Sequence, residues 1–127
     1  MTYLWVALGS ALGGMARYGC SGWAARTFGS AFPWGTLLVN VLGSSLIGFL
    51  SASAAPGARW LLPPDTRALL MIGLCGGFTT FSSFSLETLN LVRDGEWLWA
   101  AANIVFSVVV CLVFVWLGHA GGAALNR

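Results

Sequence analysis

One stretch of the chain combines a glycine pair with many hydroxyl and aromatic side chains. The pair is Gly76-Gly77, and five of the seven residues in Thr79–Ser85 carry a hydroxyl group. Three phenylalanines stand three residues apart, on one face of a continuous helix: Phe78, Phe81 and Phe84. An aromatic ring has a positive edge and a negative face. Rings turned edge-on could replace part of the water shell of a small anion, whereas rings turned face-on would favour a cation.

The same stretch lies in the middle of an apolar segment long enough to cross a membrane. Two adjacent glycines weaken a helix by roughly 1 kcal/mol each. Irregular backbone at membrane depth is tolerated only where it lines a cavity or is buried in protein, and broken helices place carbonyl groups at ion sites. We therefore expect a helix broken near the membrane midplane. The alternative is a tightly packed interface rich in Gly, Ser and Thr, without an ion.

Other polar side chains interrupt apolar segments. Asn40 could donate its amide hydrogens to an anion or join two helices, and Thr36 lies one turn earlier on the same face. Arg17 could neutralise an anion path, pair with Glu87 or extend to the membrane surface. Ser107 offers a further hydroxyl, which could equally bond to its own helix.

Nothing in the sequence indicates an enzyme. One His and four carboxylates, three of them in predicted loops, provide neither a nucleophile–base pair nor a metal cluster. The three cysteines are far apart in apolar segments, without CxxC spacing, and we interpret them as small residues at helix contacts: Cys20, Cys75 and Cys111.

Composition indicates which elements hold these residues. Of 127 residues, 57% are hydrophobic and only 8% are charged, against about 25% charged in soluble domains. A net charge of +2 is too weak for a nucleic-acid surface. We predict an all-α membrane protein with a single channel domain over 1–127. Its four spans lie at about 3–23, 35–55, 66–92 and 97–118, with tryptophans near their ends.

The arginines outside these spans are nearly balanced between the two membrane sides. One side would hold Arg59, Arg67 and Arg127, and the other Arg26 and Arg93. A difference of one arginine is a weak orientation signal, so the chain could insert one way or both ways. Oppositely inserted copies could pair about a two-fold axis in the membrane plane. Glycine pairs at helix-contact spacing also favour a homodimer: Gly9/Gly13 and Gly73/Gly77.

Three motifs together resemble the fluoride channel family known as Fluc or CrcB. Gly13–Tyr18 is similar to the family's glycine-rich first helix ending in Arg, and Phe32–Asn40 to its second-helix motif. Gly76–Ser85 is similar to its third-helix motif, with Ser83 where Thr is usual. The resemblance covers essentially the whole chain, and the combination is highly specific.

The resemblance implies an antiparallel, dual-topology homodimer with two fluoride pores in a bacterial inner (plasma) membrane. It implies that Asn40 donates to fluoride and that ring edges of Phe81 and Phe84 line the pore. A polar track would include Thr80, Ser83, Glu87 and Ser107, and we place Thr36 with it. Backbone carbonyls of Gly76 and Thr79, two from each subunit, would hold a central structural Na⁺. Cys111 stands where some relatives have a second serine, and Arg17 matches a basic residue of the family.

The expected activity is passive fluoride export that confers fluoride resistance. A membrane potential of 100 mV, negative inside, drives an anion outward with about 2.3 kcal/mol per charge. A small dual-topology multidrug transporter is an alternative, but it would need a carboxylate central to its site. A fluoride/proton antiporter and a non-conducting accessory subunit are further alternatives. The glycine pair and the hydroxyl groups argue against the accessory subunit.

Overall fold

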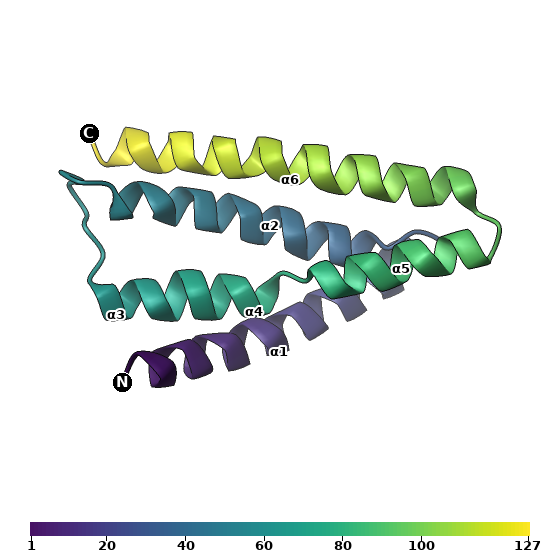
Figure 1. Ribbon diagram of the computed structural model, residues 1–127, viewed down its shortest axis with the longest axis horizontal. Coiled ribbons are helices and arrows are strands. Elements are labelled where there is room, and N and C mark those ends of the chain that lie inside the picture. Colours follow the sequence, from purple (N-terminus) through teal and green to yellow (C-terminus); the bar gives the residue numbers. More distant parts are fainter.

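The computed structural model describes all 127 residues, and every element is a helix. Four helical segments run side by side, with both termini at the same end (Figure 1). Three of them contain α1 (Thr2–Phe28), α2 (Trp34–Ser51) with the short η1 (Ala52–Ala54), and α6 (Trp97–Leu125). The remaining segment consists of α3 (Pro64–Arg67), the π-helical η2 (Ala68–Cys75), α4 (Gly76–Phe78) and α5 (Phe81–Arg93). The prediction of an all-α fold is confirmed.

The protein is a multi-pass integral membrane protein. Three segments are long and apolar enough to cross a membrane: Trp34–Ala54, Pro64–Arg93 and Trp97–Leu125. Large apolar side chains are widely exposed along them, as lipid contact requires, and Leu98 is 83% exposed. The 27 residues of α1 would extend about 40 Å, but glycines, serines and Arg17 make this helix less apolar. The first predicted span therefore stays a prediction.

Two helices continue beyond the spans predicted for them. The first loop begins at Gly29, whose φ of 84° ends α1, so Arg26 lies in the last helical turn and not in a loop. At the other end of the chain, α6 runs to Leu125 instead of stopping near residue 118. The predictions assumed spans of about 20 residues, whereas these helices extend further along the chain.

Small residues let the segments approach closely within one protomer. Gly9 and Gly73 face each other across α1 and η2, and a Cβ added to Gly73 would lie 2.9 Å from the Gly9 Cα. A Cβ on Gly77 would lie 2.7 Å from the carbonyl oxygen of Ser10. The predicted glycine pairs therefore pack α1 against the third segment of the same chain. They no longer argue for a homodimer.

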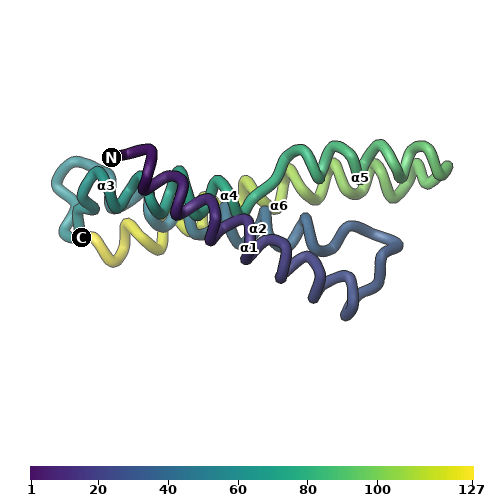
Figure 2. Tube along the Cα trace, turned by 90° about the horizontal axis from the view of Figure 1, so that it is seen from below, coloured from purple at the N-terminus to yellow at the C-terminus, as the bar shows by residue number.

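The bundle opens at the end away from the termini. Figure 2 shows α1 and the α1–α2 loop diverging there from α5 and α6. At the opposite end Asn126, the residue before the last, ties the segments together: its Oδ1 accepts from Trp60 N at 2.7 Å, and its Nδ2 donates to Ser53 Oγ at 3.3 Å.

Candidate functional site

The third segment is broken at its middle. Thr79 (φ −87°, ψ 157°) and Thr80 (φ −152°, ψ 112°) are extended between α4 and α5. The predicted break is confirmed, but its position differs, because Gly76 and Gly77 remain helical in α4. Gly77 instead provides the close contact with α1 described above. The interruption therefore depends on the groups that bind Thr79 and Thr80.

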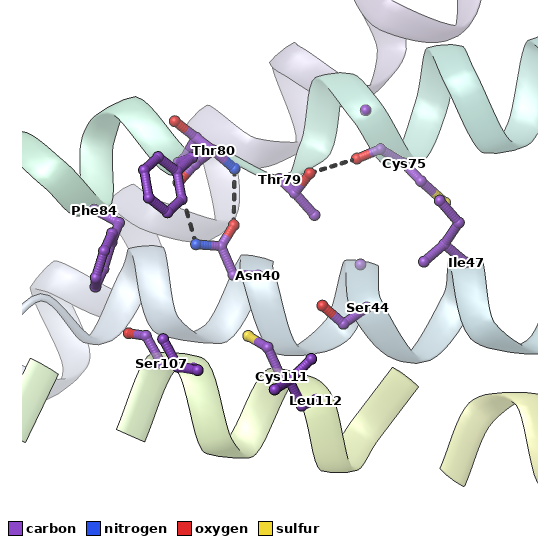
Figure 3. Close-up of a pocket in the computed structure, with 14 residues that line it drawn as sticks. Asn40, Ser44, Ile47, Cys75, Thr79, Thr80, Phe84, Ser107, Cys111 and Leu112 are labelled. Atoms are coloured by element: carbon purple, nitrogen blue, oxygen red, sulfur yellow. Dashed lines mark hydrogen bonds between the residues drawn. The ribbon is translucent and has the colours of Figure 1, made fainter. Parts of the chain in front are cut away.

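Asn40 of α2 provides hydrogen-bond partners for the backbone N–H and carbonyl of Thr80, which lose their helical partners at the break. The Thr80 N–H donates to Asn40 Oδ1 at 2.7 Å, and Asn40 Nδ2 donates to the Thr80 carbonyl at 3.1 Å (Figure 3). Of the two roles that the sequence left open for Asn40, the structure therefore shows the joining of helices. An amide nitrogen has two hydrogens, so one remains for a further acceptor.

The Thr80 side chain begins the next helix. Its Oγ1 accepts from the Ser83 N–H at 3.1 Å and donates to Ser83 Oγ at 3.1 Å. This is the usual capping bond of a threonine that precedes a helix, and a lost cap costs about 1 kcal/mol. This role was not predicted, although threonine is among the residues preferred immediately before a helix.

Arg17 binds the other side of the break. Its Nε donates to the Gly77 carbonyl at 3.1 Å, which links α1 to the end of α4. A cation near a helix C-terminus is favourable because the last carbonyls carry partial negative charge. Of the three alternatives for Arg17, the pairing with Glu87 is not formed, and that carboxylate accepts a hydrogen bond from Thr36.

A cavity of about 420 Å³ lies between α2, the break and α6, and we call it the break cavity. It brings together seven predicted site residues: Asn40, Gly76, Thr79, Thr80, Phe81, Phe84 and Ser107. The ring centroids of Phe81 and Phe84 are 5.3 Å apart, with planes inclined at 48°. Phe78 does not join them, because the break separates it from the helix that carries the other two. The prediction that the three rings line one helical face is therefore wrong.

A second cavity, of about 620 Å³, lies at the open end of the bundle, and we call it the loop-end cavity. It holds the remaining predicted residues: Arg17, Thr36, Ser83 and Glu87. Thr36 Oγ1 donates to Glu87 Oε1 at 2.8 Å, whereas Glu87 Oε2 is buried without a partner in the chain. Thr80 lines both cavities. The predicted site residues therefore form two groups that meet at this threonine.

Asn103 of α6 lies outside both cavities, bonds to the break-cavity residue Ser107 and was not predicted. It is 2% exposed, accepts from Ser107 Oγ at 3.2 Å and donates to Thr88 Oγ1 at 2.9 Å. The signal was present, since Asn103 is an amide in an apolar helix, as Asn40 is, and lies four residues before Ser107. Ser107 therefore bonds within its own helix, but to a side chain. Cys111 lines the break cavity one turn further on.

These features define the class of protein. Apolar helical segments surround a helix with irregular backbone, and polar groups from several segments line two cavities beside that irregularity. Such backbone is tolerated in membranes where it lines a cavity, and it is characteristic of proteins that move ions or solutes across them. No group of three or more His, Cys, Asp or Glu side chains could hold a metal ion.

Comparison with known proteins identifies the family. The family described as "CrcB-like protein, Camphor Resistance (CrcB)" matches residues 4–119. The fluoride-specific ion channel FluC of Rhodospirillum rubrum is 54% identical over 127 residues, covering 100% of this chain and 98% of that protein. FluC of Opitutus terrae is 55% identical over 124 residues, covering 98% and 94%. The chain belongs to the CrcB family, as predicted, and these relatives are named as ion channels, not enzymes.

Proposed function

We propose that the protein is a fluoride-selective channel that exports the ion passively and confers fluoride resistance. The observation that carries this proposal is the near-complete, 54% identical match to a protein named as a fluoride-specific ion channel. The break in the third segment supports it physically, because it places polar backbone and side-chain groups beside a cavity within an apolar bundle.

The proposed pore passes through both cavities. In the break cavity, the unused hydrogen of Asn40 Nδ2 and the ring edges of Phe81 and Phe84 face the ion, and Thr80 and Ser107 complete the polar lining. In the loop-end cavity, Thr36, Ser83 and Glu87 continue the path. Fluoride is small and strongly hydrated, so a narrow path of donors and ring edges replaces its water shell better than that of chloride.

Two backbone carbonyls at the break fit the proposed structural Na⁺. In an unbroken helix the Thr80 N–H would donate to the Gly76 carbonyl and the Ser83 N–H to the Thr79 carbonyl. These N–H groups bond to Asn40 Oδ1 and Thr80 Oγ1 instead. Gly76 and Thr79 therefore keep carbonyl oxygens without their usual helical partners, and carbonyls at half-helix ends and in unwound segments coordinate Na⁺ in membrane proteins. The cation would supply positive charge near the anion path.

The proposed assembly is an antiparallel homodimer with dual topology. Phe81 is 77% exposed although it lines the break cavity. A Cβ on Gly76 would meet nothing within 4 Å. A partner subunit would cover this open side of the break and supply its own two carbonyls to the Na⁺. The three-to-two division of the arginines fits insertion in both directions.

Fluoride release from liposomes tests the proposal. Purified protein is reconstituted into liposomes loaded with potassium fluoride, and a fluoride electrode records release after valinomycin is added. Liposomes loaded with chloride are the selectivity control. Release of fluoride without chloride is the expected result, and absence of fluoride release refutes the channel. A release rate that follows an imposed pH gradient would favour the fluoride/proton antiporter instead.

A further inference from the structure

Asn103 is deeply buried between α5 and α6, outside both cavities. Only 2% of its surface is exposed, and it is the largest fully buried polar side chain of the protein. An amide in an apolar environment is costly unless both of its ends are bonded. Here both ends are bonded, and each bond leads to a residue that contacts the proposed pore or holds one that does. The proposed pore does not itself account for this side chain.

Only one assignment of donors and acceptors satisfies the hydrogen bonds around Asn103. Thr88 Oγ1 has a single hydrogen, which it donates to the Phe84 carbonyl at 2.7 Å. Its oxygen must therefore accept from Asn103, so Nδ2 is the amide atom at 2.9 Å from it. Oδ1 then faces Ser107 at 3.2 Å, and Ser107 must donate. The orientation of the amide follows from the network.

The hydrogen bonds run from Ser107 to Asn103, from Asn103 to Thr88 and from Thr88 to the Phe84 carbonyl. This chain of bonds has two consequences for the break cavity. It ties the helical turn that carries Phe84 to α6, because Thr88 holds the Phe84 carbonyl and Asn103 holds Thr88. It also turns the only hydroxyl hydrogen of Ser107 toward Asn103. Ser107 then presents lone pairs to the cavity, and an anion there receives no hydrogen from it.

We propose that Asn103 is a positioning residue of the pore. It holds Phe84 in place and keeps the Ser107 hydrogen out of the cavity, which leaves donation to the anion to Asn40. This inference rests on the proposed function. The role requires an amide, since leucine offers neither bond and an ionised aspartate has no hydrogen for Thr88.

Two substitutions at Thr88 separate positioning from packing. Thr88→Val keeps the shape and loses the hydroxyl, whereas Thr88→Ser keeps the hydroxyl and loses a methyl group. If the hydrogen-bond chain matters, fluoride release from liposomes falls about tenfold in Thr88→Val, and Thr88→Ser stays close to the wild type. The reverse order would show that Thr88 acts by packing and would overturn the inference. Ser85→Ala is the matched control, because Ser85 makes the same bond within α5, to the Phe81 carbonyl, but is exposed.

Asn103→Leu tests the amide itself. Fluoride release by this variant should fall about tenfold. The double variant Asn103→Leu/Thr88→Val should release fluoride as fast as Asn103→Leu alone, because both substitutions break the same chain of hydrogen bonds. The reversal potential of Asn103→Leu between fluoride and chloride solutions should also shift toward that of chloride. Unchanged release and reversal potential in folded Asn103→Leu would overturn the inference. If this variant does not fold, the Thr88 pair decides.

A wild-type protein that conducts while these variants behave as the wild type contradicts the inference alone. A wild-type protein that does not conduct contradicts the proposed function as well.

Discussion

Replacing Asn40 tests how the break in the third segment is maintained. Asn40→Leu has a similar shape but offers Thr80 neither an acceptor nor a donor. The wild-type side chain makes both bonds, at 2.7 Å and 3.1 Å. The substitution therefore leaves the N–H and carbonyl of one extended residue without partners inside an apolar bundle.

The expected loss follows from these two groups. A buried polar group without a partner costs about 1–3 kcal/mol, so the pair costs about 2–6 kcal/mol. Interhelical hydrogen bonds in membranes average about 0.6 kcal/mol each, so the two bonds alone give about 1.2 kcal/mol, and the expected loss lies between this value and the lower end of the range. Asn40→Asp should lie between the wild type and Asn40→Leu, since a carboxylate still accepts from the Thr80 N–H but repels its carbonyl. Fluoride release should follow the same order.

Two measurements on each variant separate the roles of Asn40. The first is the free energy of unfolding in detergent micelles, and the second is fluoride release from liposomes. Ser45→Ala on the same helix is the control, because Ser45 Oγ bonds only to the Val41 carbonyl of its own helix, at 3.0 Å. Its effect on stability should stay within about 0.5 kcal/mol.

The results can refute this reasoning directly. If a folded Asn40→Leu variant has the same free energy of unfolding as the wild type, the two bonds to Thr80 do not stabilise the broken segment. If such a variant also lost fluoride release, Asn40 would act on the ion alone. Loss of stability and of release together is the result that the structure predicts.

Three further predictions concern the rings, the glycines and the cation. Phe81→Ile should slow fluoride release strongly and leave the assembly intact; normal release would show that the ring only packs. Gly13→Ala should destabilise the protein by about 1–3 kcal/mol, because its Cβ would overlap the Leu74 carbonyl. Gly14→Ala, which meets nothing within 4 Å, should be neutral or stabilising by up to about 1 kcal/mol, and unfolding in detergent compares the two. Replacing Na⁺ by a large organic cation during reconstitution should lower release; unchanged release would argue against the bound cation.

Local patterns in the sequence predicted the fold and the existence of the break. Apolar segments separated by loops gave the helices, and the glycine pair with the hydroxyl residues indicated the interruption. Its position could not be predicted, because it is set by Asn40, 40 residues away in the chain. The prediction that three phenylalanines share one helical face was wrong for a related reason. Helical spacing assumes a continuous helix, and the interruption falls between Phe78 and Phe81.

Hydrogen bonds between residues far apart in the sequence could not be predicted either. Arg17 was recognised as a charge within a span, but its bond to Gly77 joins residues 60 positions apart, and no periodicity reveals it. Asn103 is a different case. The rule that selected Asn40, an amide in an apolar segment, applies equally to Asn103, so the sequence contained enough information to select it.

The two charges within the spans bear on how the proposed channel would select fluoride. Arg17 donates to a carbonyl at the break, and Glu87 is bound by Thr36 in the loop-end cavity. None of the 14 residues that line the break cavity carries a charge. A fixed positive side chain there would attract chloride as well as fluoride, because the attraction depends mainly on charge. A neutral lining of amide, hydroxyl and ring-edge groups depends instead on close approach, which favours the smaller ion. The absence of charged side chains from the break cavity therefore fits selectivity by size and hydration.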